Sequence, residues 1–478
     1  MRLPATPKPD TAQDATMASD MKAIEMPLPT TPNPAVAPNA RAMDFDMNNT
    51  KMPLPATPKP DIAQDAQYIR LIPKTKILQQ IATLLPTDRD ILHFSQACKK
   101  MWTQVYASES AVWRNLFAKR YDILSVRPST EFRNEYLIRV IVLNASINFS
   151  EKEDDRQHMC MEVMRTMLEE AITAHLKPES SSKTLFRLRE SLKTMNFLKC
   201  LQKENPSELF FALQLAMTPL ALDLDITRAC HRDHYNLATI YSFDEQLNMP
   251  YIDKTQLNLD KLLQIRSFWQ RHLLTESEFT YYETFAALPS HLKPGVRKAD
   301  PKDGSNLSAS WLGLYSCLHP LPDSLEELAQ LNRQTCADME NHVDMIDIMN
   351  LEIEAQPGVD VFWPEVCTMI APPVGPETDR MYFQGKQGIH GPPGEEENTV
   401  FGFTEDIHTT YGGIGGWKRI CFTICQGNTS TTFQSKLAGD EWVHCYEALI
   451  IPGGRLMLGR WVDMKNETGR GPFIFWDL

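Results

Sequence analysis

The sequence predicts an α+β multidomain protein, with a disordered Pro-rich N-terminal tail, helical regions after it and a C-terminal antiparallel β domain of the barrel or sandwich kind. Three observations lead to this prediction. Residues 1–67 are dominated by Pro, Thr, Ala and Asp and carry no apolar face. Residues 68–288 repeat apolar side chains at helical spacing. Residues 309–478 carry short apolar or alternating runs between Gly and Pro clusters, which is typical of strands.

Composition limits the classes of function. The chain has 478 residues and a formal net charge of −13, so it can hold two or three domains and lacks the basic face of a nucleic-acid binder. Its ten cysteines show no close, regular spacing, which is typical of reduced thiols in an intracellular protein. No apolar run approaches the ~18 residues of a membrane helix, and the first ten residues lack the apolar region of a secretory signal. We therefore expect the cytoplasm, the nucleus or both, with no membrane and no nucleic acid as partner.

The first 67 residues contain a near-repeat. LPATPKPDTAQDA at 3–15 recurs as LPATPKPDIAQDA at 54–66, and a weaker copy lies at 27–34. A period in this range can indicate a solenoid, but the repeat has no apolar face to stack, so we expect disorder with polyproline character. The Thr-Pro steps in each copy are candidates for proline-directed phosphorylation. A duplicated linker without a role is the alternative.

Residues 68–122 predict a module of three short helices. Within it, the apolar stretch 72–117, about 45 residues long, cannot bury its apolar side chains by itself, so we expect it to dock on a partner. Three helices in the core of an all-α domain are the alternative. Asp88-Arg89-Asp90 marks the start of the second helix. The apolar positions at helical spacing are Ile77, Leu78, Ile81, Leu84 and Leu85 in the first helix and Ile91, Leu92, Phe94, Ser95 and Cys98 around the second.

The order of residues in 72–117 resembles the F-box, the adaptor-binding module of ubiquitin-ligase receptors. The chain departs from the F-box pattern at two points: one extra residue follows Pro73, and Lys76 stands where the family usually has Glu. The residues that carry the resemblance are Ile72-Pro73, Ile77-Leu78, Asp90-Ile91-Leu92, Ala97-Cys98-Lys99 and Trp113-Arg114.

The resemblance implies a non-catalytic substrate receptor of an SCF-type (Skp–cullin–F-box) ubiquitin ligase. Such a receptor binds a Skp-family adaptor, reaches the cullin–RING ligase core through it, and holds a protein substrate that the sequence does not identify. It needs no cofactor, metal or catalytic residue. The resemblance implies adaptor contacts at Ile72, Pro73, Ile77, Leu78, Ile81, Leu84, Leu85, Asp90, Ile91, Leu92, Phe94, Ser95, Cys98, Lys99 and Trp102.

Residues 123–288 predict a helical middle region. The segment 132–147 is apolar enough for a buried helix. The methionine-rich face of 156–176 suggests either core or an adaptable peptide-binding surface. The phrase at 265–273, IRSFWQRHL, is similar to one that recurs in fungal F-box proteins. Further helices are predicted over 183–203, 207–221 and 257–286, and a Pro- and Gly-rich linker over 289–308.

Residues 309–478 predict the β domain. Its segments at 446–461 and 471–476 resemble the terminal domain of fungal F-box proteins, and the domain is similar to the β-barrel-like substrate domain of the cyclin-D-binding F-box subfamily. The resemblance implies that this domain holds the substrate. We expect one helical piece over 341–355, and either a bulge or a close backbone approach at Gly459. Strands are predicted over 310–318, 359–363, 381–385, 417–425, 442–451, 455–462 and 473–476.

Several groups of residues in the sequence resemble sites for a metal ion, a phosphate or a basic peptide. Cys421, Cys425, His444 and Cys445 resemble a zinc set in spacing, but four residues along a strand span about 13 Å, so we expect core cysteines instead. The glycine run 412–416 suggests a phosphate loop, yet no Lys-Ser/Thr or helix follows, which favours a flexible loop between strands. We expect Glu395–Glu397 to form a solvated acidic loop. No catalytic signature is present.

Two rival hypotheses remain from the sequence alone. The first is a small-ligand-binding or enzymatic β-barrel protein with an enclosed pocket. The second is an F-box scaffold that binds the adaptor but acts outside a ligase.

Overall fold

The computed structural model describes residues 74–478 with gaps. The predicted tail and Ile72-Pro73 lie outside the described residues. The gaps are 108–109, 125–128, 146, 151, 176–181, 200–203, 227–233, 242–251, 254–255, 277–278, 295–306, 308, 318–347, 356–362, 369–370, 372, 374–379, 390–397, 428–441, 454 and 466–468.

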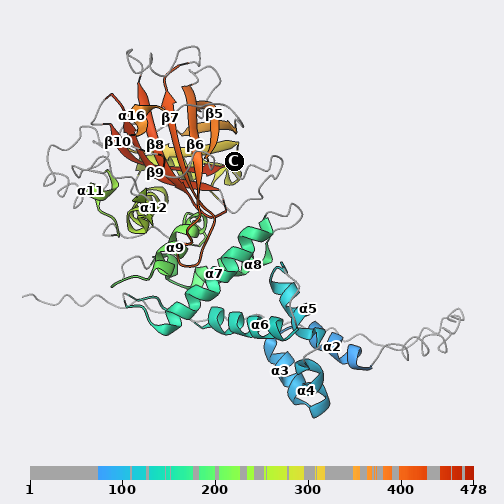
Figure 1. Ribbon diagram of the computed structural model, residues 1–478. Helices are drawn as coiled ribbons and strands as arrows, with labels where there is room; N and C mark the ends of the chain where they lie inside the picture. The colour runs from blue at the N-terminus through green and yellow to red at the C-terminus, as the bar shows by residue number, and fades with distance from the viewer. Residues whose placement is uncertain are drawn as a thin grey trace, which may run out of the picture. The chain divides into compact units, whose positions relative to one another are not determined.

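Four short helices open the described chain, one more than the three predicted over 68–122 (Figure 1). A capping box starts the second of them: the Asp90 amide donates to Thr87 Oγ1 at 3.1 Å, and the Asp90 carboxylate accepts from the Thr87 amide at 3.2 Å. The helix start expected at 88–90 is therefore present. The helices are α2 (Lys74–Leu84), α3 (Asp88–Gln96), α4 (Lys99–Tyr106) and α5 (Ala111–Arg120).

The middle region is helical, as the sequence predicts. The sequence also predicts that the helix over 132–147 is buried. This prediction is wrong for one side of the helix, because Leu137, Ile138 and Ile141 are exposed. The elements are α6 (Ser129–Asn144), α7 (Asp155–His175), α8 (Lys183–Thr194), η1 (Phe197–Lys199), α9 (Glu208–Ala216), α10 (Thr218–Ala221), α11 (Leu237–Ile240), β1 (Ile252–Asp253), β2 (Gln256–Leu257), α12 (Leu259–Leu274), α13 (Phe279–Ala287) and η4 (Ser290–Leu292).

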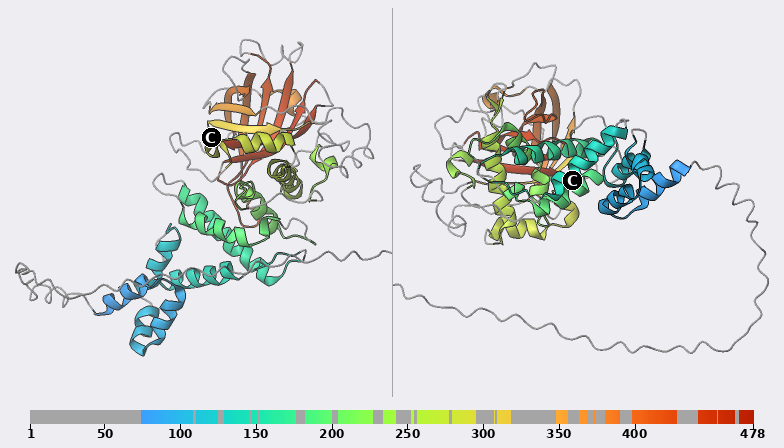
Figure 2. Two further views of the ribbon diagram at one scale, coloured as in Figure 1. Left: turned by 180° about the vertical axis from the view of Figure 1, so that it is seen from behind. Right: turned by 90° about the horizontal axis from the view of Figure 1, so that it is seen from below.

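Eight antiparallel strands then close into a barrel, which confirms the barrel alternative for the β domain. Each strand pairs with its neighbour in sequence, and β10 closes the barrel on β3, so the C-terminus lies beside the yellow β3 (Figure 2). The strands are β3 (Ser310–Tyr315), β4 (Met349–Ala355), β5 (Arg380–Ile389), β6 (Asn398–Ile407), β7 (Trp417–Cys425), β8 (Val443–Ile450), β9 (Leu456–Asp463) and β10 (Arg470–Asp477), with the short α16 (Glu365–Thr368) between β4 and β5.

Two local predictions in the β domain fail. The helix expected over 341–355 is wrong from residue 349 on, because Met349, Leu351 and Ile353 alternate with polar residues and form β4; residues 341–347 lie outside the described part. The strand expected over 359–363 is described only at Trp363, which lies outside any strand. The β6 segment was not predicted, since Gly, Thr, Glu and Asp interrupt its apolar pattern.

The barrel interior is filled by side chains. One apolar cluster receives a side chain from each of the eight strands, which only inward-pointing positions of a closed barrel permit. At its centre Phe422 stacks on Tyr446, with ring centroids 4.6 Å apart and planes 4° apart. The strand members named one per strand are Trp311, Leu351, Phe383, Val400, Phe422, Tyr446, Trp461 and Phe475.

The helical region packs on the outer wall of the barrel. Leu456, Leu458 and Trp476 point outward and belong to the same apolar cluster as α12, and the Trp476 indole donates to the Leu292 carbonyl at 2.7 Å. Helix α12 contacts β9 directly (Figure 1). The close approach expected at Gly459 is confirmed, since a Cβ there would lie 2.1 Å from the Glu447 carbonyl oxygen.

Candidate functional site

The predicted adaptor contacts fall into three groups by exposure. Ile72 and Pro73 lie outside the described residues. Ile91 and Ser95 are buried, at 2% and 0% exposure, so they support the module from inside. Ile77, Leu78, Leu85, Asp90 and Phe94 are half-buried. The exposed members are Ile81, Leu84, Leu92, Cys98, Lys99 and Trp102.

Four apolar side chains of α2–α4 stand in solvent. Ile81 is 40% exposed, Leu84 76%, Leu92 41% and Trp102 48%, and the three helices that carry them contact one another. We call these four side chains the α2–α4 apolar surface. Their exposure leaves these side chains available for contact with a partner.

A small core closed by α5 supports the module. Trp113 is 5% exposed, and its indole donates to the Val105 carbonyl at 2.9 Å. The Trp102 ring lies 4.2 Å from Tyr106, and Tyr106 lies 5.6 Å from Trp113. Aromatic packing of this kind fixes the orientation of α4, so the exposed ring of Trp102 is presented on a supported helix.

Asp88 joins the module to the helical body. Its carboxylate accepts from the Arg120 guanidinium at 2.9 Å and from the Tyr136 hydroxyl at 2.5 Å. Burial and this hydrogen bond raise the pKa of Tyr136 well above its ordinary value. The bonds run from the start of α3 to α5 and α6, so the α2–α4 apolar surface is anchored to the helices behind it.

The four residues of the candidate zinc set do not face one site. His444 shares its strand face with the interior residue Tyr446 and lies 4.7 Å from the Trp461 ring, whereas Cys421 and Cys445 belong to an apolar cluster on the outer wall. The hydrogen bond to Cys367 and burial raise the pKa of the Cys445 thiol, and burial raises that of Cys421. Within the described parts of the chain, no three His, Cys, Asp or Glu side chains form a group that could hold a metal ion.

The glycine run lies in the β6–β7 connection, between strands as expected, and it holds the barrel on α9. The Gly412 amide donates to the Glu208 carboxylate at 2.5 Å, and a Cβ at Gly412 would lie 2.5 Å from Leu209 Cα. An amide that already binds a carboxylate is not free for a phosphate. Glu395–Glu397 lie outside the described residues.

A row of five charged side chains crosses the outer wall of the barrel and was missed from the sequence; four of them are buried and Arg380 is half-buried. It runs over five neighbouring strands and alternates in sign. Each carboxylate lies between two guanidinium groups, at N···O distances of 2.6–3.3 Å. The five residues, which we call the charge row, are Arg380, Glu405, Arg419, Glu447 and Arg460. Because every charge is paired within the row, its arrangement is that of a structural ion network.

Comparison with known proteins adds no relative to this picture. No family model matches the chain, and neither a curated protein nor a solved structure matches it. Among the helices that the structure describes, none is long and apolar enough to span a bilayer.

Proposed function

We propose that this chain is the substrate receptor of an SCF-type ubiquitin ligase. The observation that carries the proposal is the α2–α4 apolar surface, which lies within the segment whose residue order resembles an F-box. Ile81, Leu84, Leu92 and Trp102 would enter the apolar groove of a Skp-family adaptor. Burying one such side chain contributes roughly 1.5–3 kcal/mol before the costs of association.

The receptor acts by proximity and supplies no reacting group. The adaptor links α2–α4 to the cullin–RING core, and the rest of the chain holds a protein substrate near the ubiquitin-charged enzyme, which raises its effective concentration there. The closed barrel and the helices packed on it are a rigid support for that task, because they share one apolar cluster. We assign substrate binding to this part of the chain.

The rival hypothesis of a ligand-binding barrel gains no support from the described residues. Aromatic and aliphatic side chains from all eight strands occupy the barrel interior. A barrel that binds a small molecule instead keeps an open cavity lined by a few polar groups. We therefore do not propose a small-molecule activity.

The proposal is tested by co-expression with a Skp-family adaptor and purification through a tag on this chain. The wild-type chain is expected to recover the adaptor and, with it, cullin. Leu84→Asp with Leu92→Asp is expected to lose both, because a buried unpaired charge opposes docking in an apolar groove. Phe186→Asp on α8 is the matched control, since Phe186 is also an exposed apolar residue, at 57%. Recovery of the adaptor without cullin would indicate a scaffold outside a ligase, and recovery by the double variant would overturn the proposal.

A further inference from the structure

Helix α6 is apolar on two sides. Phe132, Tyr136 and Val142 are buried against the neighbouring helices. On the other side Leu137, Ile138 and Ile141, at positions i, i+1 and i+4, are 37%, 48% and 66% exposed. A helix that packs on one side only is expected to be polar on the other, so the part of the fold that the structure describes does not explain this stripe.

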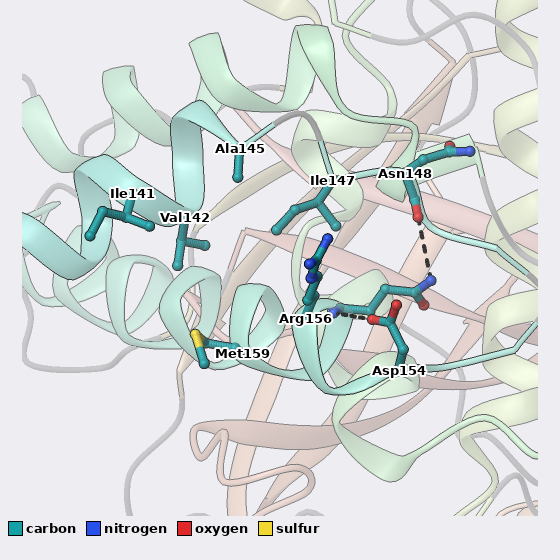
Figure 3. A pocket seen from close by; sticks show the side chains of 9 residues that line it. Ile141, Val142, Ala145, Ile147, Asn148, Asp154, Arg156 and Met159 are labelled. Carbon is teal, nitrogen blue, oxygen red and sulfur yellow. Dashed lines mark hydrogen bonds between the residues drawn. The ribbon is translucent and has the colours of Figure 1, made fainter.

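A pocket of about 450 Å³ lies beside the stripe, between the end of α6 and the start of α7 (Figure 3). Ile141 and Met159, 66% and 57% exposed, form its apolar rim. The volume falls within the range of pockets that take a ligand or an anchoring side chain, about 300–1,000 Å³. The lining residues are Ile141, Val142, Ala145, Ile147, Asn148, Asp154, Arg156, Gln157 and Met159.

The pocket carries one available positive charge. Arg156 is exposed and lines the pocket, and it forms no hydrogen bond or ion pair with any residue that the structure describes. Asp154 also lines the pocket, but its carboxylate accepts from the Gln157 amide at 2.7 Å at the start of α7, where the positive end of the helix dipole offsets its charge (Figure 3). Arg156 therefore favours a carboxylate on whatever enters the pocket.

We call the pocket together with the exposed stripe of α6 the α6–α7 groove. The two helices that carry it are joined before anything binds. The buried Arg139 of α6 donates to both carboxylate oxygens of Glu170 on α7, each at 2.8 Å. The connection between the two helices is also held, because the Gln157 side chain donates to the Asn148 carbonyl at 3.3 Å and to Ser150 Oγ at 3.0 Å. A preformed groove lowers the ordering cost of binding.

From these observations we propose that the α6–α7 groove binds an amphipathic helical segment of a partner protein, with an apolar anchor in the pocket and a neighbouring Asp or Glu on Arg156. The exposed stripe of α6 would receive the rest of the apolar face of that segment. This docking site goes beyond the proposed receptor function and uses none of the α2–α4 residues, so either proposal can fail without the other.

The probes are two fluorescein-labelled amphipathic helical peptides with the same leucine-rich face, one with Glu and one with Lys beside the central Leu. Binding to the whole chain is measured by fluorescence anisotropy. The wild-type chain is expected to bind the Glu peptide about fivefold more tightly than the Lys peptide, the range of a partly exposed ion pair. Arg156→Glu is expected to reverse this preference, and Ile141→Asp to abolish binding of both peptides.

Phe186→Asp and the Leu84→Asp/Leu92→Asp variant are expected to bind both peptides as the wild type does. Circular dichroism and thermal unfolding confirm that each variant is folded. Unchanged binding by Ile141→Asp, or an unchanged preference in Arg156→Glu, would overturn the proposal. So would self-association of the wild-type chain in light scattering that Ile141→Asp abolishes, because a second copy would then occupy the groove.

Discussion

Arg419 on β7 donates two hydrogen bonds to Glu447 Oε1 on β8, at 2.6 and 3.0 Å, and both side chains are only 1% exposed. The second Glu447 oxygen accepts from Arg460 on β9 at 3.1 Å, and Arg419 also reaches Glu405 on β6. Charges opposite one another on neighbouring strands are placed by register, here Glu405 against Arg419 and Glu447 against Arg460. The charge row therefore links four strands through Glu447 and its partners.

Glu447→Gln is expected to destabilise the protein by about 3–5 kcal/mol, because two buried guanidinium groups lose their shared counter-charge. The measurement is the free energy of unfolding in urea. Glu354→Gln on β4 is the control, since Glu354 is exposed on its strand. Equal unfolding free energies for the two variants would show that the charge row contributes no more than a surface carboxylate.

Gly459→Ala is expected to cost about 1–3 kcal/mol, because the new Cβ meets the backbone of β8, which cannot move without breaking the ladder. Gly388 on β5 offers a matched control, since a Cβ there would have no heavy atom within 4 Å. Thermal unfolding of Gly459→Ala and Gly388→Ala compares the two sites. A melting temperature of Gly459→Ala equal to that of Gly388→Ala would contradict the close packing of β9 on β8.

Stability is expected to fall between pH 6.5 and about 4 because of His444. Burial lowers the pKa of His444 to about 4, against the opposing charge of Asp463. The unfolded chain takes up the proton near pH 6.5, while the folded chain takes it up only near pH 4, so acid favours unfolding throughout that window. The full effect is at most about 3 kcal/mol.

Urea unfolding of the wild type and His444→Gln across that pH window measures the contribution of this side chain. The difference between the two unfolding free energies is expected to shrink steadily as the pH falls. His158→Gln, at an exposed histidine, is the control. A difference that stays constant with pH would refute a neutral, half-buried His444.

Trp102 and Trp113 are expected to respond oppositely to truncation. Trp113 is buried, so Trp113→Ala should cost about 3–5 kcal/mol of stability. Trp102 is 48% exposed, so Trp102→Ala should cost under about 1 kcal/mol and yet weaken adaptor binding. Urea unfolding and adaptor titration of both variants make the comparison. Strong destabilisation by Trp102→Ala would place this side chain in the core and remove it from the α2–α4 apolar surface.

The fold was predictable where the apolar pattern is local. The prediction of 417–425 has the bounds of β7, and that of 156–176 differs from α7 by one residue at each end. In β4, three apolar residues alternate with polar ones, but a helix was expected because the preceding residues continue the pattern at helical spacing. The partners of Arg419 were not predictable in this way, because strand register brings together residues 14 and 28 positions apart in the sequence. The closure of the barrel depends on strand pairing in the same way.

The sequence does not predict which of the candidate contact residues are exposed. Ile91 and Leu92 are neighbours in the sequence, yet Ile91 is 2% exposed and Leu92 41%, because helix packing decides which of them faces inward. The exposure of the α6 stripe could not be predicted for the same reason. An apolar helix is expected to be buried when the elements that pack on it are not known. Its signal in the sequence is apolar residues on more than one helical face, at Tyr136, Leu137 and Ile138.

The central claim is tested most directly by calorimetric titration of a purified Skp-family adaptor into the purified whole chain. We predict a saturable one-to-one complex for the wild type and for Phe186→Asp. We predict a loss of at least about a hundredfold in affinity for Leu84→Asp with Leu92→Asp, since each central anchor of an interface carries about 1–2 kcal/mol or more. A wild-type chain that binds no adaptor, or a double variant that binds as tightly as the wild type, would contradict the assignment of α2–α4 as the adaptor-binding module.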